Sequence, residues 1–76
     1  MQNDDKTTKW ERYERIYRMY ADNVYKVCLY YSKDKKKAAD DTERVFVEFY
    51  DEFENVESDQ LFALLIRKAK NMAVNK

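Results

Sequence analysis

The side chains that could do chemistry in this 76-residue chain are almost all carboxylates and amines, with fifteen Asp and Glu against fifteen Lys and Arg. There is one Cys, and His and Gly are both absent. The chain therefore lacks the usual acid–base residue and the Gly-rich loop that cradles a phosphate. Asp40 and Asp41 do not make a catalytic pair, because neighbouring residues on a helix point about 100° apart. We expect a binding protein, with no enzymatic activity, no metal site and no cofactor.

The carboxylates of residues 34–53 are instead arranged for binding. On a helix of about 3.6 residues per turn, Asp40, Glu43 and Asp51 share one face, opposite the apolar side chains of the same segment. Val47 lies among these acids as a single apolar residue. Such a row is typical of a surface that binds a basic helix. The alternative is a solvated acidic face without a partner.

The zero net charge hides a division of the chain into three segments of different sign. Residues 1–37 carry a formal charge of +4, residues 38–60 carry −8, and residues 61–76 carry +4. One interpretation is a dipolar domain whose helices attract one another. The other is a pair of docking surfaces for partners of opposite charge.

The basic C-terminal segment predicts a second surface. Arg67, Lys70 and Asn71 fall on the side of a helix opposite its apolar stripe, with Lys68 at the boundary. Leu64 is predicted to project among them as an apolar residue. A basic helix face of this kind is suited to the phosphates of a nucleic acid.

The elements that position these residues are predicted to be helices, because Gly and Pro are absent and hairpins and most tight turns depend on them. The fold class is therefore all-α, a three-helix bundle in one domain. The apolar periodicity gives helices near residues 9–31, 35–54 and 59–75. The predicted core is Tyr17, Tyr20, Val24, Val45, Phe46, Phe49, Leu61 and Leu65. Cys28, on the same apolar stripe as Val24, is expected to be buried and inert.

Local signals mark the ends of the elements. Residues 1–8 are predicted to be a disordered tail, and residues 9–76 the helical domain. Thr8 and Glu11 fit a capping box at the start of the first helix, and Asp34 and Ser58 fit the N-caps of the second and third. The lysines in the first turn of the second helix, Lys35, Lys36 and Lys37, are expected to be solvated, with a phosphate contact as the alternative.

The two chain ends add two further expectations. No apolar run is long enough to cross a membrane, so no membrane segment is expected and we expect a cytoplasmic protein. No C-cap signal precedes Lys76, so we expect a fragment of a longer protein.

Two short patterns resemble a known family. The pattern A-x-D-x-x-x-x-V-F is formed by Ala38, Asp40, Val45 and Phe46, and L-x-R-x-A-x-N follows in Leu65, Arg67, Ala69 and Asn71. Together they resemble region two of bacterial RNA polymerase sigma factors, closest to the extracytoplasmic-function (ECF) group. The likeness covers residues 9–75.

The resemblance implies a function for each helix. The second helix would bind the clamp helices of the largest subunit of core RNA polymerase through Asp40, Glu43, Val47 and Asp51. The third would bind the non-template single strand of the minus ten promoter element, which makes the chain a DNA-binding factor in transcription initiation and its regulation. The DNA-binding residues would be Leu64, Arg67, Lys68, Lys70 and Asn71. An anti-sigma factor is a further partner that the family suggests.

The chain departs from the family at several positions. The family usually has Gln at Glu43, an apolar residue at Asp41 and Lys68, and an aromatic residue at Leu64. Without that aromatic ring a stacking platform worth about 1–3 kcal/mol per base is lost. The alternative function is a small helical module for protein–protein interaction or self-association without DNA binding. It predicts that Arg67, Lys70 and Asn71 are engaged with the acids of the second helix.

Overall fold

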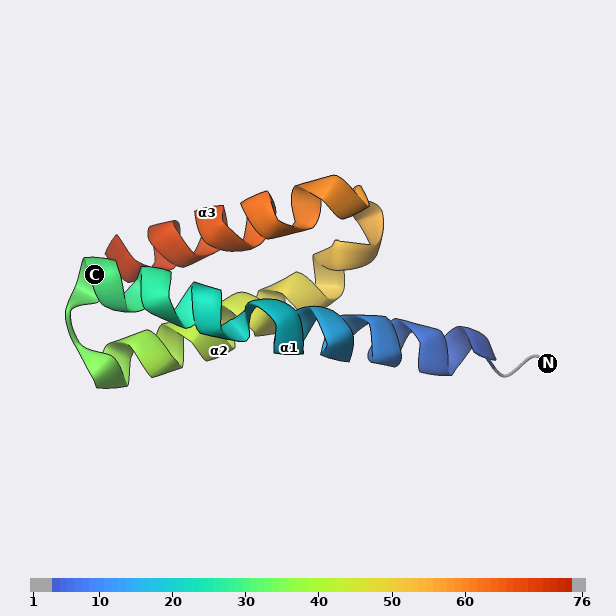
Figure 1. Cartoon of the computed structure of the whole chain (residues 1–76), viewed down its shortest axis with the longest axis horizontal. Helices are drawn as coiled ribbons and strands as arrows, with labels where there is room; N and C mark the ends of the chain where they lie inside the picture. The colour runs from blue at the N-terminus through green and yellow to red at the C-terminus, as the bar shows by residue number, and fades with distance from the viewer. Residues whose placement is uncertain (1–3, 75–76) are drawn as a thin grey trace.

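A computed structural model describes residues 4–74, and within them the chain forms three α-helices joined by short connections (Figure 1). Helix α1 spans Asp4–Ser32, α2 spans Lys35–Glu52 and α3 spans Leu61–Val74. Two short 3-10 turns, η1 at Phe53–Asn55 and η2 at Ser58–Gln60, link α2 to α3. All three helices pack against one another, and α1 extends past the other two at its N-terminal end. The predicted all-α three-helix bundle is confirmed.

Two predicted helix ends are wrong. Helix α1 begins at Asp4 instead of Thr8, so the second half of the predicted tail is helical. Helix α3 begins at Leu61 after the turn η2, so Ser58 is not its N-cap. The start of the predicted tail, residues 1–3, and the end of the predicted third helix, Asn75, lie outside the described residues.

The connection between α1 and α2 consists of Lys33 and Asp34. Lys33 adopts the left-handed conformation, with φ of 58°, and its N–H donates to the carbonyl of Leu29 at 2.7 Å. Lys33 therefore occupies the left-handed position after the end of a helix, where glycine is the usual residue. The Asp34 carboxylate accepts from the N–H groups of Lys36 and Lys37 at 3.0 and 3.2 Å, which confirms the predicted N-cap of α2.

The core lies where the three helices meet. Its fully buried members are Val24, Cys28, Ala38, Val45, Phe46, Phe49, Phe53, Leu65, Ala69 and Ala73. The predicted core residues of α2 are confirmed, whereas Tyr20 and Leu61 are half-buried. Tyr17 is 43% exposed, so its assignment to the core is wrong, although its ring packs edge-on to Phe46 with centroids 4.8 Å apart. It lies at the margin of the contact between α1 and α2, where one side of the ring faces solvent.

Two polar groups on the inner face of α1 contact the neighbouring helices. The hydroxyl of Tyr13 donates to the carbonyl of Phe46 in α2 at 3.1 Å. The thiol of Cys28 donates to the carbonyl of Ala69 in α3 at 3.9 Å. Burial raises the pKa of both groups, and in Tyr13 the nearby Tyr17 and Tyr50 raise it further. Cys28 is buried and free, as predicted.

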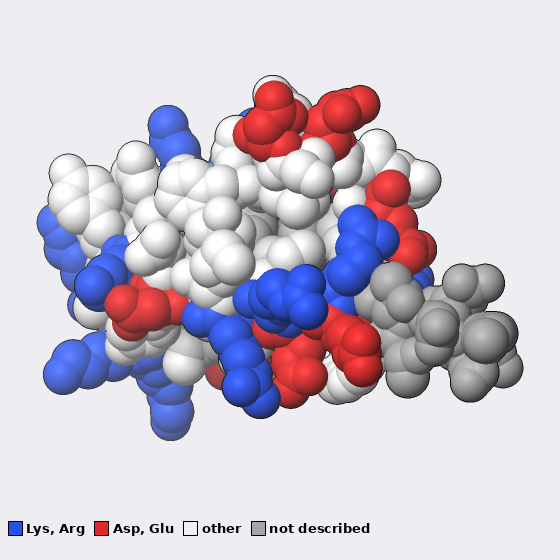
Figure 2. Space-filling view, turned by 45° about the vertical axis from the view of Figure 1, so that its right-hand side comes forward, with Lys and Arg blue, Asp and Glu red and all other residues white. Residues whose placement is uncertain are grey.

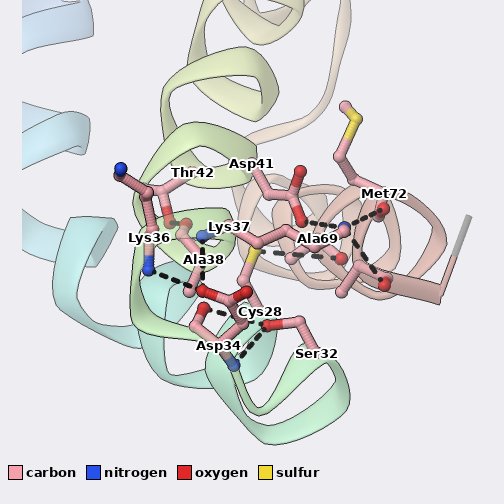
Figure 3. Close-up of polar contacts among 11 residues, drawn as sticks. Cys28, Ser32, Asp34, Lys36, Lys37, Ala38, Asp41, Thr42, Ala69 and Met72 are labelled. Atoms are coloured by element: carbon pink, nitrogen blue, oxygen red, sulfur yellow. Dashed lines mark hydrogen bonds and ion pairs between the residues drawn. The ribbon is translucent and has the colours of Figure 1, made fainter. Parts of the chain in front are cut away.

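The ammonium of Lys37, in the first turn of α2, bonds both to a buried carboxylate of the same helix and to the last turn of α3 (Figure 3). The Lys37 ammonium donates to the Asp41 carboxylate at 2.6 Å and to the carbonyls of Met72 and Ala73 at 3.4 Å. Asp41 is only 4% exposed. The prediction that Lys37 is solvated is therefore wrong, because its side chain reaches the carbonyls at the end of α3. The C-terminal end of a helix carries the negative end of the helix dipole, so the Lys37 ammonium is favourably placed there.

Replacement of Lys37 by Met should destabilise the domain by about 1–3 kcal/mol, because it leaves a buried carboxylate without its partner. The double variant Lys37→Met/Asp41→Leu should lose less than the single variant, since it removes both charges. Urea unfolding followed by circular dichroism measures both. Lys36→Met, which changes an exposed neighbour, is the control. Equal unfolding midpoints for the Lys37 and Lys36 variants would show that the pair contributes nothing.

Candidate protein-binding and nucleic-acid-binding surfaces

The acidic residues predicted to bind a partner share the outer face of α2. Asp40, Glu43 and Asp51 are exposed, and Val47 is 64% exposed among them. Among the described residues, none of the three carboxylates forms an ion pair. The placement predicted for this face is confirmed. We call these four residues the acidic face.

A shallow depression gives the acidic face its shape. It has a volume of about 510 Å³ and is lined by Asp40, Glu43, Arg44, Val47 and Glu48 of α2 with Met72 of α3. Met72 adds a second apolar side chain beside Val47, which the sequence did not indicate because the two residues come from different helices. Asp51 lies outside the depression, on the same helix. A depression lined by two apolar side chains, three carboxylates and one guanidinium can receive an apolar side chain from a mainly basic helix.

The outer side of α3 carries the predicted basic residues. Arg67, Lys70 and Asn71 are exposed, and within the described part of the chain neither Arg67 nor Lys70 forms an ion pair. The Lys70 ammonium lies 5.9 Å from the centre of the Tyr31 ring of α1. We call Arg67, Lys70 and Asn71 the basic face. They are not engaged with the acids of α2.

Lys68 belongs to the bundle instead of the basic face. Its ammonium donates to Glu52 at 3.0 Å and to Glu48 at 3.2 Å, and its side chain is mostly buried. Burial alone lowers the pKa of Lys68, but the hydrogen bonds and charges of Glu52 and Glu48 outweigh it, so the pKa lies above its usual value. Its predicted place at the boundary of the helix face is confirmed. As a DNA-binding residue it remains a prediction, and its ammonium is already engaged with carboxylates.

Leu64 does not project into solvent as predicted. It is half-buried and packs against the core, while Phe62 is 41% exposed. The buried side of α3 is centred on Leu65 and Ala69, and the helix is rotated so that Leu64 lies nearer to this side than predicted. The aliphatic side chain at this position offers no ring for stacking.

Sequence reasoning missed a hollow between α1 and α3. It has a volume of about 280 Å³ and is lined by Val27, Tyr30, Tyr31 and Ile66, with Lys26 and Lys70 at its rim. The exposure of two adjacent tyrosines at the end of α1 could have been suspected, since two neighbours cannot both face the same side of a helix.

Charged side chains are unevenly placed on the surface that Figure 2 displays. On this face an uncharged area lies in the middle, acidic side chains lie at its upper edge, and basic and acidic side chains are intermixed below it and on its right. The acidic face and the basic face described above belong to different helices. Separation of the two signs allows two partners of opposite charge to bind without competing for the same side chains.

Other kinds of site find no support in the described residues. No group of three or more His, Cys, Asp or Glu side chains there is placed to hold a metal ion. None of the helices described is both long enough and apolar enough to cross a membrane. Comparison with known proteins yields no match to a family model, to a curated protein or to a solved structure.

The ion pairs of Lys68 predict a dependence of stability on pH. Because the pKa of Lys68 is raised in the folded state, its contribution is present below the usual lysine value of about 10.4 and is lost as the pH rises through the folded-state pKa. Lys68→Met should cost roughly 0.2–1 kcal/mol per pair near neutral pH and less at alkaline pH. Urea unfolding across this range measures the difference. In a Glu48→Gln/Glu52→Gln background the cost of Lys68→Met should no longer change with pH. If the pH dependence persists in that background, it does not come from these two ion pairs.

Proposed function

We propose that this chain is a transcription initiation module that bridges bacterial RNA polymerase and promoter DNA. In this proposal the acidic face on α2 binds the clamp helices of the largest polymerase subunit. The basic face on α3 binds the non-template single strand of the minus ten promoter element. The function is that of a binding module in the cytoplasm rather than an enzyme, in keeping with the sigma region two resemblance of residues 9–75. An anti-sigma factor would regulate it by covering one of these faces.

One observation carries the proposal. The basic face and the acidic face are both exposed, and their charged side chains do not form ion pairs with one another. Arg67 and Lys70 form no ion pair among the described residues, and neither do Asp40 and Glu43. The alternative function predicted that the basic residues would be engaged with the acids of α2. Only Lys68 is so engaged, through Glu48 and Glu52. A folded bundle without partners has no need to leave both sets of charges free.

Val47 supports the protein-binding half of the proposal. Val47 and the neighbouring Met72 give the acidic face an apolar centre, which a partner helix would bury. Charged residues around such a centre mainly speed association and select the partner, while the apolar centre slows dissociation. The acidic face and Val47 should therefore affect different rate constants.

We expect the chain to bind a clamp-helix fragment of the largest polymerase subunit in surface-binding measurements. Asp40→Lys/Glu43→Lys should slow association and weaken its salt dependence, because these charges steer a basic partner. Val47→Asp should speed dissociation, at a cost of about 2 kcal/mol or more if Val47 is at the centre of the interface.

Matched controls exist elsewhere on the surface. Val74 is an exposed valine on α3, so Val74→Asp adds the same charge outside the acidic face. Glu57→Lys/Asp59→Lys reverses two exposed acids in the connection to α3. Binding that responds to these controls as strongly as to the α2 variants would move the interface away from the acidic face. If the unmodified chain does not bind the clamp-helix fragment, the proposed binding to polymerase is wrong.

Binding of single-stranded DNA should depend on the basic face. The isolated domain should bind a short oligonucleotide weakly, with strong dependence on salt, because only a few cations meet its phosphates. Arg67→Glu/Lys70→Glu should abolish binding in a fluorescence anisotropy titration. Lys35→Glu/Lys36→Glu makes the same change in charge at the start of α2 and should leave most of the binding. The reverse order of effects would place the DNA on the lysines of α2.

A further inference from the structure

The hollow between α1 and α3 shares only Lys70 with the two faces that the proposed function uses. Its lining is apolar apart from the two lysines at the rim. Tyr30 is 71% exposed and Tyr31 is 40% exposed. Their rings meet edge to face, with centroids 5.0 Å apart and planes at 89°. Rings this close touch each other, so a molecule in the hollow lies against their outer surfaces and not between them.

The lysines at the rim have different surroundings. The Lys26 ammonium pairs with Asp22 at 3.0 Å, in an exposed contact within α1. Lys70 forms no ion pair among the described residues and its ammonium lies 5.9 Å from the centre of the Tyr31 ring. Arg67 is one helical turn before Lys70 on the same exposed side of α3. The charge beside the rings is therefore positive, and part of it is unpaired.

We propose that the Tyr30–Tyr31 hollow holds a nucleobase of the single strand whose phosphates meet Arg67 and Lys70. This inference rests on the DNA-binding half of the proposed function and adds the residues that take up a base. Proteins that bind single strands combine a positively charged path for the backbone with aromatic rings for the bases. Both parts occur here within the side chains of α1 and α3.

The hollow also replaces a feature that α3 lacks. Leu64 is aliphatic and half-buried, so it supplies no ring for a base. Tyr30 and Tyr31 supply rings from the neighbouring helix, beside the cation Lys70 of α3. A purely apolar ligand would make no use of that cation, whereas a nucleotide uses the ring and the charge together.

The test compares two oligonucleotides of equal length, one of deoxythymidine and one of abasic deoxyribose phosphate. The parent should bind the first more tightly by at least about 5-fold, because a stacked base adds to the phosphate contacts. Tyr30→Ala should lower binding of the deoxythymidine strand to the abasic level and leave binding of the abasic strand unchanged. Tyr30→Phe keeps the ring and should retain the preference.

Trp10→Ala is the matched control, since Trp10 is an exposed aromatic residue at the other end of α1. It should leave the preference for bases intact, and circular dichroism melts should show that each variant is folded. Equal binding of the two oligonucleotides by the parent, with binding still lost in Arg67→Glu/Lys70→Glu, overturns this inference and leaves the proposed function standing. No binding of either oligonucleotide overturns the DNA-binding half as well. Binding of an acidic, tyrosine-containing peptide through Tyr30, without any preference for bases, assigns the hollow to a protein and also overturns the inference.

Discussion

The contact of Lys37 with Asp41 and with the last carbonyls of α3 sets the alignment on which both candidate surfaces depend. Helix α2 carries the acidic face and α3 carries the basic face, and the two helices are held together at one end by this contact. Lys68 holds them further along through Glu48 and Glu52. A change in the crossing of these helices would move Met72 away from Val47 and shift Arg67 and Lys70 relative to the acidic face. The geometry of both surfaces is therefore a property of helix packing as much as of their own residues.

Aromatic residues let so short a chain form a core. Phe46 and Phe49 on the inner face of α2 and Phe53 at the start of η1 are fully buried, and Tyr13 of α1 packs against all three. Large rings bury much apolar area per residue, which matters in a domain with a high ratio of surface to volume. Other rings of α1 remain exposed, Trp10 in its N-terminal half and Tyr30 near its C-terminal end.

How far the sequence could predict the molecule differs from helix to helix. The period of α2 is unambiguous, so its buried side, its N-cap Asp34 and the exposed position of Val47 all follow from one helical wheel. The wheel of α3 gives its apolar side only approximately, and its rotation about its own axis is decided by contacts with two neighbours. Leu64 and Lys68 are therefore turned towards the bundle, contrary to the prediction for Leu64.

Features built from two helices could not be predicted at all. The sequence gives no sign that Asp41 is buried. Its burial becomes apparent only in the folded bundle, where its partner Lys37 also bonds to the last carbonyls of α3. The hollow between α1 and α3 and the contact of Met72 with the acidic depression depend in the same way on tertiary packing. The sigma region two resemblance stays a prediction, because its evidence is two short patterns and the charges that accompany them.

The two-residue connection between α1 and α2, Lys33 and Asp34, bears on how fast the chain folds. It brings two long helices into register with almost no loop to close, so many of the native contacts between them form between residues near each other in sequence. Helical proteins with such local contacts are the fastest folders known. The chain also contains no proline, so isomerisation of prolyl bonds cannot add a slow phase. Refolding should therefore be a rapid, single-phase event.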